Sequence, residues 1–261
     1  MSTKGTALIT GASTGIGAVY ADRLAKRGYD LILVARNLDR LKEVAAKLAS
    51  TGVKIETLQA DLTDKGDLAK VEKRLADDKT ITQLINNAGM AVAGNMLDGD
   101  IDKFEQMILL NVLAPTRLAK AAAVAFAARK TGTIINIASV LALVPEMFGG
   151  VYSGTKAFIL NLTQSLRVEL APHGVTVQAV LPGATRTEIW ERAGHDVNAL
   201  PAEMVMDVDE MVDAAIKGFD LGEPVTIPSL PDIAQWNALQ GARQALGPNL
   251  SLKNAAARYK A

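Results

Sequence analysis

A tyrosine and a lysine four residues apart form the first candidate site. Tyr152 and Lys156 are the ends of the run Tyr-Ser-Gly-Thr-Lys. In a helix this spacing places both side chains on one face. A phenol has a pKa of about 10, and a nearby ammonium stabilises the phenolate and lowers that pKa. The pair predicts a general acid/base, although the spacing alone also fits an ordinary pair on a helix surface.

A serine upstream supports the catalytic interpretation. Ser139 follows the apolar run 134–138 and precedes Tyr152 by 13 residues. Ligands in open α/β sheets bind at the carboxyl ends of strands, and Ser139 stands at such an end. Its hydroxyl is therefore expected to hydrogen-bond a substrate oxygen.

An asparagine in an apolar helical stretch is the next unusual residue. Asn111 is disfavoured inside a helix, and Pro115 follows it by four residues. Pro115 has no N–H, so the carbonyl of Asn111 loses its helical partner and the helix should bend. We expect that carbonyl to hold a water that contacts Lys156, which gives Tyr152 a proton route. A solvated kink without function is the alternative.

A glycine-rich turn predicts a phosphate-binding site. Gly11, Gly15 and Gly17 have the spacing Gly-x-x-x-Gly-x-Gly between the first expected strand and the first expected helix. Glycines let the backbone turn sharply and approach a ligand, and a helix N-terminus attracts a pyrophosphate. A tight turn without a ligand is the alternative. The residues expected to contact the cofactor here are Gly11, Ser13, Thr14, Gly15, Ile16 and Gly17.

The end of the second expected strand indicates which dinucleotide is bound. NAD-binding folds place an acidic residue here for the ribose 2′-hydroxyl, but this chain has Arg36 followed by Asn37. A guanidinium pairs with a 2′-phosphate, whereas an acid would repel it. The sequence therefore predicts NADP(H), with Ser13 as a second phosphate contact. An exposed arginine at a helix start is the alternative.

These residues are set in an alternation of short apolar runs and longer helical patterns. The runs expected to be strands are 6–10, 31–35, 53–60, 83–86, 132–138, 175–181 and 224–227. The helical patterns are 18–27, 37–49, 64–75, 101–128 and 152–171. Strands that are apolar on both faces indicate a covered parallel sheet. We expect a doubly wound Rossmann-type α/β fold of about seven strands, in the order 3-2-1-4-5-6-7, with helices on both faces.

Composition limits the classes of protein that remain. The chain of 261 residues has 28 Lys and Arg against 28 Asp and Glu, no Cys and two His. This balance gives no electrostatic case for nucleic acid or an anionic membrane, and the residues present do not suggest a metal site. No secretion signal or membrane span is expected, so we expect a cytoplasmic protein.

We expect one domain over residues 1–261. The segment 184–223 holds ten acidic and three basic residues and is interpreted as a substrate lid, with an acidic surface excursion as the alternative. The long helices are apolar on more than one face, which predicts a homodimer or homotetramer. Residues expected to line an apolar substrate pocket, or equally to anchor loops, are 140–145, Met147, Phe148, Ile189, Trp190, Met204 and Met206.

In their order and spacing these motifs resemble the short-chain dehydrogenase/reductase family, in its short single-domain branch, from residue 10 to about 187. The resemblance implies an NADP-dependent oxidoreductase that acts on a carbonyl/alcohol pair and is similar to broad-specificity bacterial reductases. It implies that Tyr152 is the acid/base, Ser139 polarises the carbonyl, Lys156 lowers the pKa of Tyr152 and binds ribose, and Asn111 completes a relay. It also implies cofactor contacts at Asp61, Leu62, Asn87, Ala88, Gly89, Pro182, Gly183, Thr185 and Thr187.

Two other functions share parts of this pattern. A catalytically silent NADP-binding sensor usually lacks the Tyr, the Lys or the Ser, and this chain has all three. An epimerase or dehydratase of the longer nucleotide-sugar branch also uses Tyr-x-x-x-Lys, but with a different glycine spacing and a longer C-terminal region. The resemblance implies nothing about the tail after Pro228.

Overall fold

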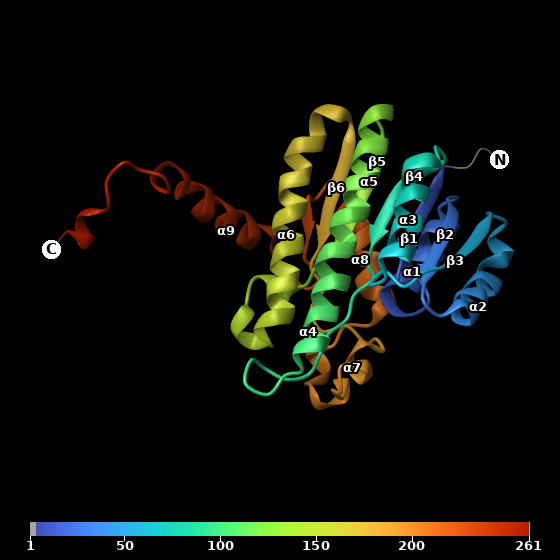
Figure 1. Cartoon of the computed structure of the whole chain (residues 1–261), viewed down its shortest axis with the longest axis horizontal. Helices are drawn as coiled ribbons and strands as arrows, with labels where there is room; N and C mark the ends of the chain where they lie inside the picture. Colours follow the sequence, from blue (N-terminus) through green and yellow to red (C-terminus); the bar gives the residue numbers. More distant parts are fainter. Residues whose placement is uncertain (1–3, 261) are drawn as a thin grey trace. The chain divides into compact units, whose positions relative to one another are not determined.

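The computed structural model describes residues 4–260, and a parallel sheet of seven strands forms its centre (Figure 1). The strands are β1 (Thr6–Thr10), β2 (Asp30–Ala35), β3 (Ile55–Gln59), β4 (Ile81–Asn86), β5 (Gly132–Ile137), β6 (Val175–Val180) and β7 (Val225–Thr226). They pair in the order β3-β2-β1-β4-β5-β6-β7, and every pair is parallel. The predicted fold and strand order are confirmed.

Helices cover both faces of this sheet. The principal ones before residue 229 are α1 (Gly15–Lys26), α2 (Leu38–Leu48), α3 (Lys65–Asp77), α4 (Ile101–Ile108), α5 (Ala114–Arg129), α6 (Gly150–Leu170), α7 (Ile189–Arg192) and α8 (Val208–Asp220). Apolar side chains of α3, α5 and α6 share one core cluster with the sheet. Those of α1, α2 and α8 share a second cluster on the other face.

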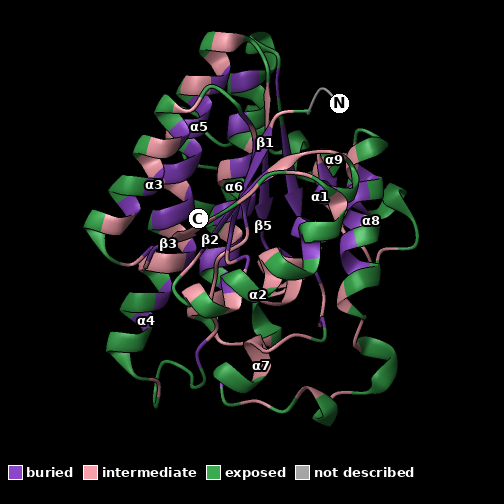
Figure 2. Ribbon diagram, turned by 90° about the vertical axis from the view of Figure 1, so that its right-hand side faces the viewer, coloured by how far each residue is buried: buried purple, intermediate pink, exposed green. Residues whose placement is uncertain are grey.

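The central strands are mostly apolar because their side chains supply both clusters. In β1, Leu8 belongs to the first cluster, whereas Ala7 and Ile9 belong to the second. Successive side chains of a strand point to opposite faces, so a sheet covered on both sides has no polar face. Figure 2 shows the strands buried and the outer faces of the helices exposed. Polar groups that follow the strands are therefore concentrated at the carboxyl edge of the sheet.

The long helical stretch from Ile101 to Arg129 is interrupted where the sequence predicts a bend. A π-helical turn, Leu109–Leu113, joins α4 to α5 immediately before Pro115. Because proline has no N–H, the regular helical hydrogen-bond ladder cannot continue through it. This stretch is apolar and long enough to cross a membrane by length and composition, with a mean hydropathy of 1.4 over its most apolar window. Leu118, Ala122 and Phe126 nevertheless pack in the first core cluster, as in a core helix.

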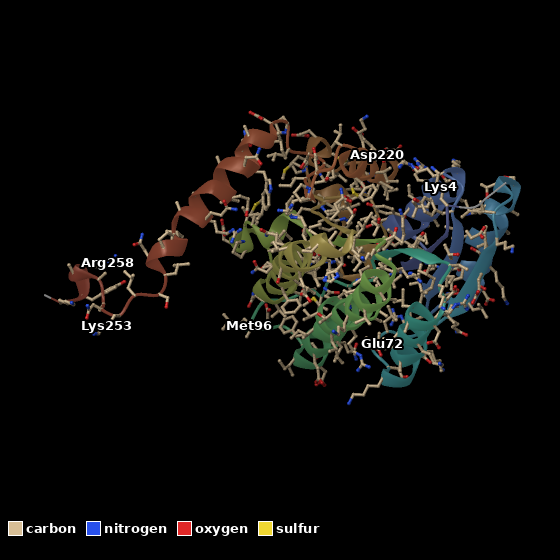
Figure 3. The ribbon with its side chains drawn as sticks, turned by 90° about the horizontal axis from the view of Figure 1, so that it is seen from above. Lys4, Glu72, Met96, Asp220, Lys253 and Arg258 are labelled. Carbon is tan, nitrogen blue, oxygen red and sulfur yellow. The ribbon has the colours of Figure 1, made fainter. Side chains whose placement is uncertain are left out.

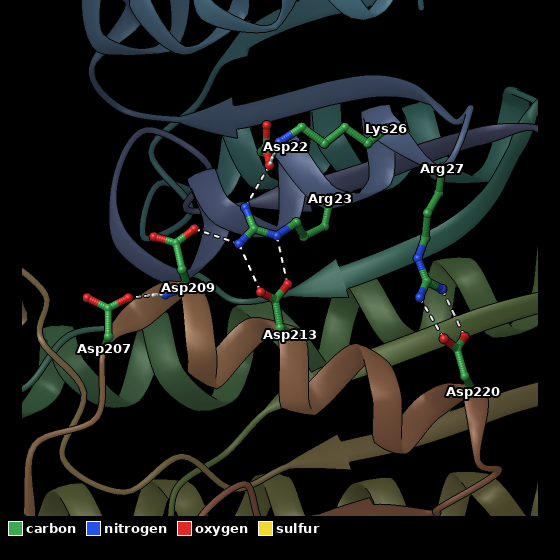
Figure 4. A network of polar contacts seen from close by, with 8 residues as sticks. All are labelled: Asp22, Arg23, Lys26, Arg27, Asp207, Asp209, Asp213 and Asp220. Atoms are coloured by element: carbon green, nitrogen blue, oxygen red, sulfur yellow. Dashed lines mark hydrogen bonds and ion pairs between the residues drawn. The ribbon is translucent and has the colours of Figure 1, made fainter.

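Only the first part of the predicted lid segment is irregular. Residues 184–207 contain the short α7 and two 3-10 turns, whereas α8 carries the core residues Met211, Val212 and Ala215. Ion pairs also join α8 to α1 (Figure 4). Arg23 of α1 reaches Asp209 and Asp213, each at 2.7 Å, and Arg27 reaches Asp220 at 2.6 Å. A mobile lid is therefore proposed for 184–207 alone.

Residues from Ser229 onward form a second compact unit. It contains α9 (Ile233–Ala245) and two 3-10 turns. The prediction of one domain over the whole chain stays a prediction. So does the homo-oligomer, although large apolar side chains on the outer faces of α5 and α6, Val124, Phe158 and Val168, are exposed.

Candidate active site

The predicted tyrosine and lysine meet at the start of α6. Lys156 lies one helical turn after Tyr152, and its Nζ is 5.6 Å from the centre of the Tyr152 ring. The Lys156 ammonium is buried and donates a hydrogen bond of 3.1 Å to the carbonyl oxygen of Ile137, the last residue of β5. The end of β5 therefore holds the lysine beside the tyrosine.

Ser139 is the second group that contacts the tyrosine. It follows β5, is buried, and its hydroxyl is hydrogen-bonded to the Tyr152 hydroxyl. Its Oγ also accepts a hydrogen bond of 3.2 Å from the amide of Leu141 and lies 3.5 Å from the carbonyl oxygen of Pro182. These contacts fix the serine between the ends of β5 and β6, as its place in the sequence predicts.

Asn111 lies within the π-helical turn and is almost fully buried. Its Oδ1 accepts from the amide of Met90 at 2.9 Å, and its Nδ2 donates to the Met90 carbonyl at 2.8 Å and to Thr155 Oγ1 at 3.2 Å. A Cβ at Gly89 would lie 3.2 Å from Asn111 Oδ1 and 3.5 Å from Lys156 Nζ. The glycine thus keeps open a space that borders both side chains. The water relay through Asn111 stays a proposal.

A buried chain of side-chain amides, which was not predicted from the sequence, supports the π-helical turn that contains Asn111. Asn86 Nδ2 donates to the Pro115 carbonyl at 3.2 Å and to Asn136 Oδ1 at 2.9 Å. Asn136 Nδ2 donates in turn to Thr163 Oγ1 at 2.9 Å. These contacts join β4, β5 and α6 to the first turn of α5, and so position Asn111. A single asparagine near the carboxyl end of each of two mostly apolar strands, Asn86 in β4 and Asn136 in β5, was the available signal.

Burial shifts the pKa values of Tyr152 and Lys156. The shift of Tyr152 is opposite to the lowering that the neighbouring lysine predicts. Burial raises the pKa of Tyr152 to about 12, and the hydrogen bond with Ser139 lowers it by less. Burial lowers the pKa of Lys156 to about 8, because a cation is poorly solvated there. In the chain alone the tyrosine is therefore a fully protonated donor, and the lysine is the group that titrates near neutral pH.

We expect Lys156→Met to stabilise the protein at pH 7. The unfolded chain holds this proton up to about 10.5 and the folded chain only up to about 8, so the ammonium destabilises the fold below pH 8. The ammonium destabilises the fold by about 3 kcal/mol. The variant also loses the hydrogen bond to the Ile137 carbonyl, which destabilises it by about 1 kcal/mol. Urea unfolding at pH 7 should show a gain of about 2 kcal/mol that shrinks as the pH rises toward 10.5. Equal or lower stability at pH 7 would contradict the pKa direction.

The glycine-rich turn lies directly against the end of β4. Asn87 Nδ2 donates to the carbonyl of Thr10 at 2.9 Å and to that of Gly11 at 3.3 Å. A Cβ on Gly17 would lie 2.4 Å from the Gly11 oxygen, and Gly11 itself has a φ of 67°. The backbone therefore requires glycine at both positions. Thr10 Oγ1 accepts from the amides of Asn87 and Ala88, each at 3.0 Å, and so joins the turn to β4.

The start of α1 is free to accept an outside anion. Asn or Asp side chains cap the N-termini of α2, α3, α4 and α8, but Thr14 makes no capping hydrogen bond to α1, and the first turn of α1 has no acidic residue. Ser13, Thr14, Gly15 and Ile16 are partly exposed around it. The unsatisfied N–H groups and the helix dipole fit a pyrophosphate.

The residues predicted on the adenosine side have mixed roles. Arg36 is exposed, and its guanidinium has no ion-pair partner within residues 4–260. Asn37 Oδ1 caps α2 by accepting from the Arg40 amide at 3.0 Å. Asp61 Oδ1 accepts from the amide and hydroxyl of Thr63, and Leu62 is buried. Asn37 and Asp61 therefore shape their turns, and their cofactor contacts stay proposals.

The segment after β6 returns to the glycine-rich turn. A Cβ on Gly15 would lie 3.2 Å from the side chain of Thr187. Thr185 is buried and donates to the Gly183 carbonyl at 3.1 Å. Trp190 Nε1 donates to the Thr185 carbonyl at 2.9 Å, so this residue, predicted as a pocket wall, anchors the loop. Pro182, Gly183, Thr185 and Thr187 thus lie at the edge of the sheet that carries Ser139.

Tyr152 has apolar neighbours. The Phe148 ring lies edge-on to Tyr152 at 5.8 Å, and His195 lies edge-on to Phe148 at 5.6 Å. His195 was not expected here, because it is remote from Tyr152 in the sequence. A shallow hollow of about 10 Å³ lies beside Tyr152 between the loop after β4, α4 and the start of α6. Its apolar lining includes Val92, Phe104 and Met107. Met96, which also lines it, is exposed and is labelled in Figure 3.

Comparisons with known proteins agree with this geometry. The profile of the short chain dehydrogenase family matches residues 5–198. An oxidoreductase from Staphylococcus epidermidis is 35% identical over 186 residues, which are 71% of this chain and 80% of that protein.

Two solved structures match nearly the whole chain. A short-chain dehydrogenase from Sphingobium yanoikuyae in complex with NADPH is 55% identical, with a TM-score of 0.95 and coverage of 98% of this chain and 99% of that chain. A bulky-bulky ketone specific alcohol dehydrogenase from Comamonas testosteroni is 48% identical, with a TM-score of 0.91 and coverage of 99% of both chains.

Proposed function

The chain belongs to the short-chain dehydrogenase family of oxidoreductases, and we propose that it reduces ketones with NADPH, with Tyr152 as the proton donor. The observation that carries the proposal is the meeting of Tyr152, Ser139 and Lys156 at the carboxyl edge of the sheet. The silent-sensor alternative is not favoured, because the tyrosine, the serine and the lysine are all present and lie close together.

Each catalytic group has a distinct task in this proposal. When bound, the reduced nicotinamide supplies the hydride that reduces the carbonyl carbon. The hydroxyls of Ser139 and Tyr152 hydrogen-bond the carbonyl oxygen, which becomes negative and takes the Tyr152 proton. The Lys156 ammonium, 5.6 Å from the Tyr152 ring, stabilises the phenolate that remains. Lys156 then gives a proton to the Tyr152 phenolate, and a water held at Asn111 and the space beside Gly89 reprotonates Lys156.

NADP(H) is the proposed cofactor for two reasons. The unpaired guanidinium of Arg36 follows β2, where the fold binds the adenosine ribose, and no carboxylate replaces it. The Sphingobium relative is a complex with NADPH. The open N-terminus of α1 would hold the pyrophosphate, with Ser13 and Thr14 beside it. Cytoplasmic location stays an expectation.

We propose ketones with two large apolar substituents as the substrate class. Tyr152 has an aromatic neighbour, Phe148, and the apolar hollow beside it. The Comamonas relative is named for specificity toward bulky-bulky ketones. Phe148 and the apolar side chains of the hollow favour a ketone with apolar substituents.

We expect the wild-type enzyme to prefer a diaryl or long dialkyl ketone over the matching methyl ketone. Burial of the additional carbons should raise kcat/KM by about tenfold or more. The measurement is ketone-dependent loss of NADPH absorbance with the two ketones under identical conditions. Equal kcat/KM would contradict the substrate class, and no NADPH oxidation with any ketone would contradict the proposed function.

A further inference from the structure

An ion pair joins α2 to the segment that lies against the glycine-rich turn. Glu188 follows Thr187, the residue that lies against Gly15. Its Oε2 accepts a hydrogen bond of 2.7 Å from Arg40 Nη1, and Arg40 belongs to the first turn of α2. The contact therefore links the segment after β6 to the helix after β2, which are far apart in the sequence and in the strand order.

The pair is held in place at both ends. The amide of Arg40 donates to Asn37 Oδ1, which caps α2. Glu188 also accepts from Arg192 Nη2 at 2.6 Å, within α7. Arg40 lowers the pKa of the Glu188 carboxyl, so the glutamate is ionised at neutral pH. Both side chains are 43% exposed, so the contact lies at the surface.

The place of this contact suggests its effect. Thr187, next to Glu188, lies against Gly15 of the glycine-rich turn, and Arg40 belongs to α2, the helix that follows Arg36. On the proposed function, a dinucleotide extends along that turn toward Arg36, and it has to pass the contact to leave. We propose that Arg40 and Glu188 form a strap across the mouth of the cofactor groove and slow the dissociation of NADPH and NADH alike.

Arg40 has a second possible role that the test must separate. It stands four residues after Arg36, and an arginine there that bound the 2′-phosphate would affect NADPH alone. A strap acts on the shared part of both cofactors. The strap also requires Glu188. If Arg40 instead bound the 2′-phosphate, Glu188 would repel that phosphate and weaken NADPH binding.

The experiment measures cofactor dissociation rates by stopped-flow fluorescence for Arg40→Gln, Glu188→Gln and the double variant. We expect each single variant to release both cofactors three- to fivefold faster, and the double variant no faster than either. This change corresponds to about 0.7–1 kcal/mol at 1.4 kcal/mol per factor of ten, the range of an exposed ion pair. Arg74→Gln is the matched control, since it removes an arginine of α3 that pairs at the surface with Glu56 and Asp78, and it should leave the rates unchanged.

Three results would overturn the strap. If Arg40→Gln accelerates the release of NADPH alone while Glu188→Gln slows it, Arg40 is a phosphate ligand and not part of a strap. Unchanged rates in both single variants, with cofactor bound, would overturn the strap and leave the proposed function intact. Failure of the wild-type protein to bind either cofactor would overturn both.

A second readout needs no cofactor. Hydrogen exchange of the amides in 187–192 should be faster in Glu188→Gln than in the wild-type protein, because the segment loses its attachment to α2. Arg40→Gln should have the same effect although it lies on another element. Exchange that is unchanged in Arg40→Gln would contradict the attachment.

Discussion

Replacement of Tyr152 by Phe should lower turnover by about 10²–10⁴-fold while NADPH still binds. The substitution removes only the hydroxyl that is proposed to donate the proton, and the ring keeps its edge-on contact with Phe148. Ser139 keeps its contacts with Leu141 and Pro182, so no buried group is left without a partner. Steady-state rates with a bulky ketone give the loss, and NADPH fluorescence gives the binding.

The stability of the variant is the control for this experiment. Urea unfolding of Tyr152→Phe at pH 7 should match the wild-type protein, because the phenol with a pKa of about 12 is neutral there. A variant that retains more than about a tenth of the wild-type rate would remove Tyr152 from the proposed role. Loss of NADPH binding together with turnover would indicate a structural effect instead.

Arg36→Asp should reverse the preference for NADPH over NADH. The exposed guanidinium is proposed to pair with the 2′-phosphate, and one such charge-assisted hydrogen bond contributes about 1.5 kcal/mol or less at an exposed site. That amounts to about a tenfold preference. An aspartate would repel the phosphate and accept from the 2′-hydroxyl of NADH, so NADH should gain as NADPH loses.

The measurement is kcat/KM for both cofactors at one ionic strength, because salt screens the phosphate contact. Arg36→Ala is the matched control and should lower only the NADPH value, with some preference left if Ser13 also contacts the phosphate. Equal use of NADH and NADPH by the wild-type protein would contradict the role of Arg36.

The sequence predicts which residues stand at the carboxyl edge of the sheet, because they follow apolar strands. Strands buried on both faces are apolar, so polar and glycine residues that follow them mark the carboxyl edge of the sheet. Gly11 and Ser139 were placed in this way, and the i, i+4 spacing placed Lys156 beside Tyr152. The missing N–H of Pro115 likewise predicts the irregular helix, although the π-helical form of the turn depends on its tertiary contacts.

Contacts between distant surface segments were not predictable. Glu188 and Arg40 are separated by 148 positions, and nothing local marks them as a pair. The contact of Phe148 with His195 depends on the path of the loop after β6. The lid predicted from the acidic excess of 184–223 stays a prediction, but the ion pairs of Asp209, Asp213 and Asp220 with Arg23 and Arg27 at the end of α1 had no local signal.

The pKa of Tyr152 shows the limit of reasoning from pairs of residues. The spacing indicates that Lys156 stabilises the phenolate, but it says nothing about how deeply both groups are buried. In the folded chain burial dominates both pKa values. A bound cationic nicotinamide ring would add the charge that favours the phenolate.

Transfer of deuterium from deuterated NADPH to a bulky ketone tests the central claim most directly. The enzyme is incubated with the ketone and NADPH that carries deuterium at the reactive position of the nicotinamide, and the alcohol product is analysed by mass spectrometry and NMR. The account predicts an alcohol with deuterium at the carbinol carbon and a hydroxyl proton from solvent. NADPH that binds without any deuterium appearing in an alcohol would contradict it.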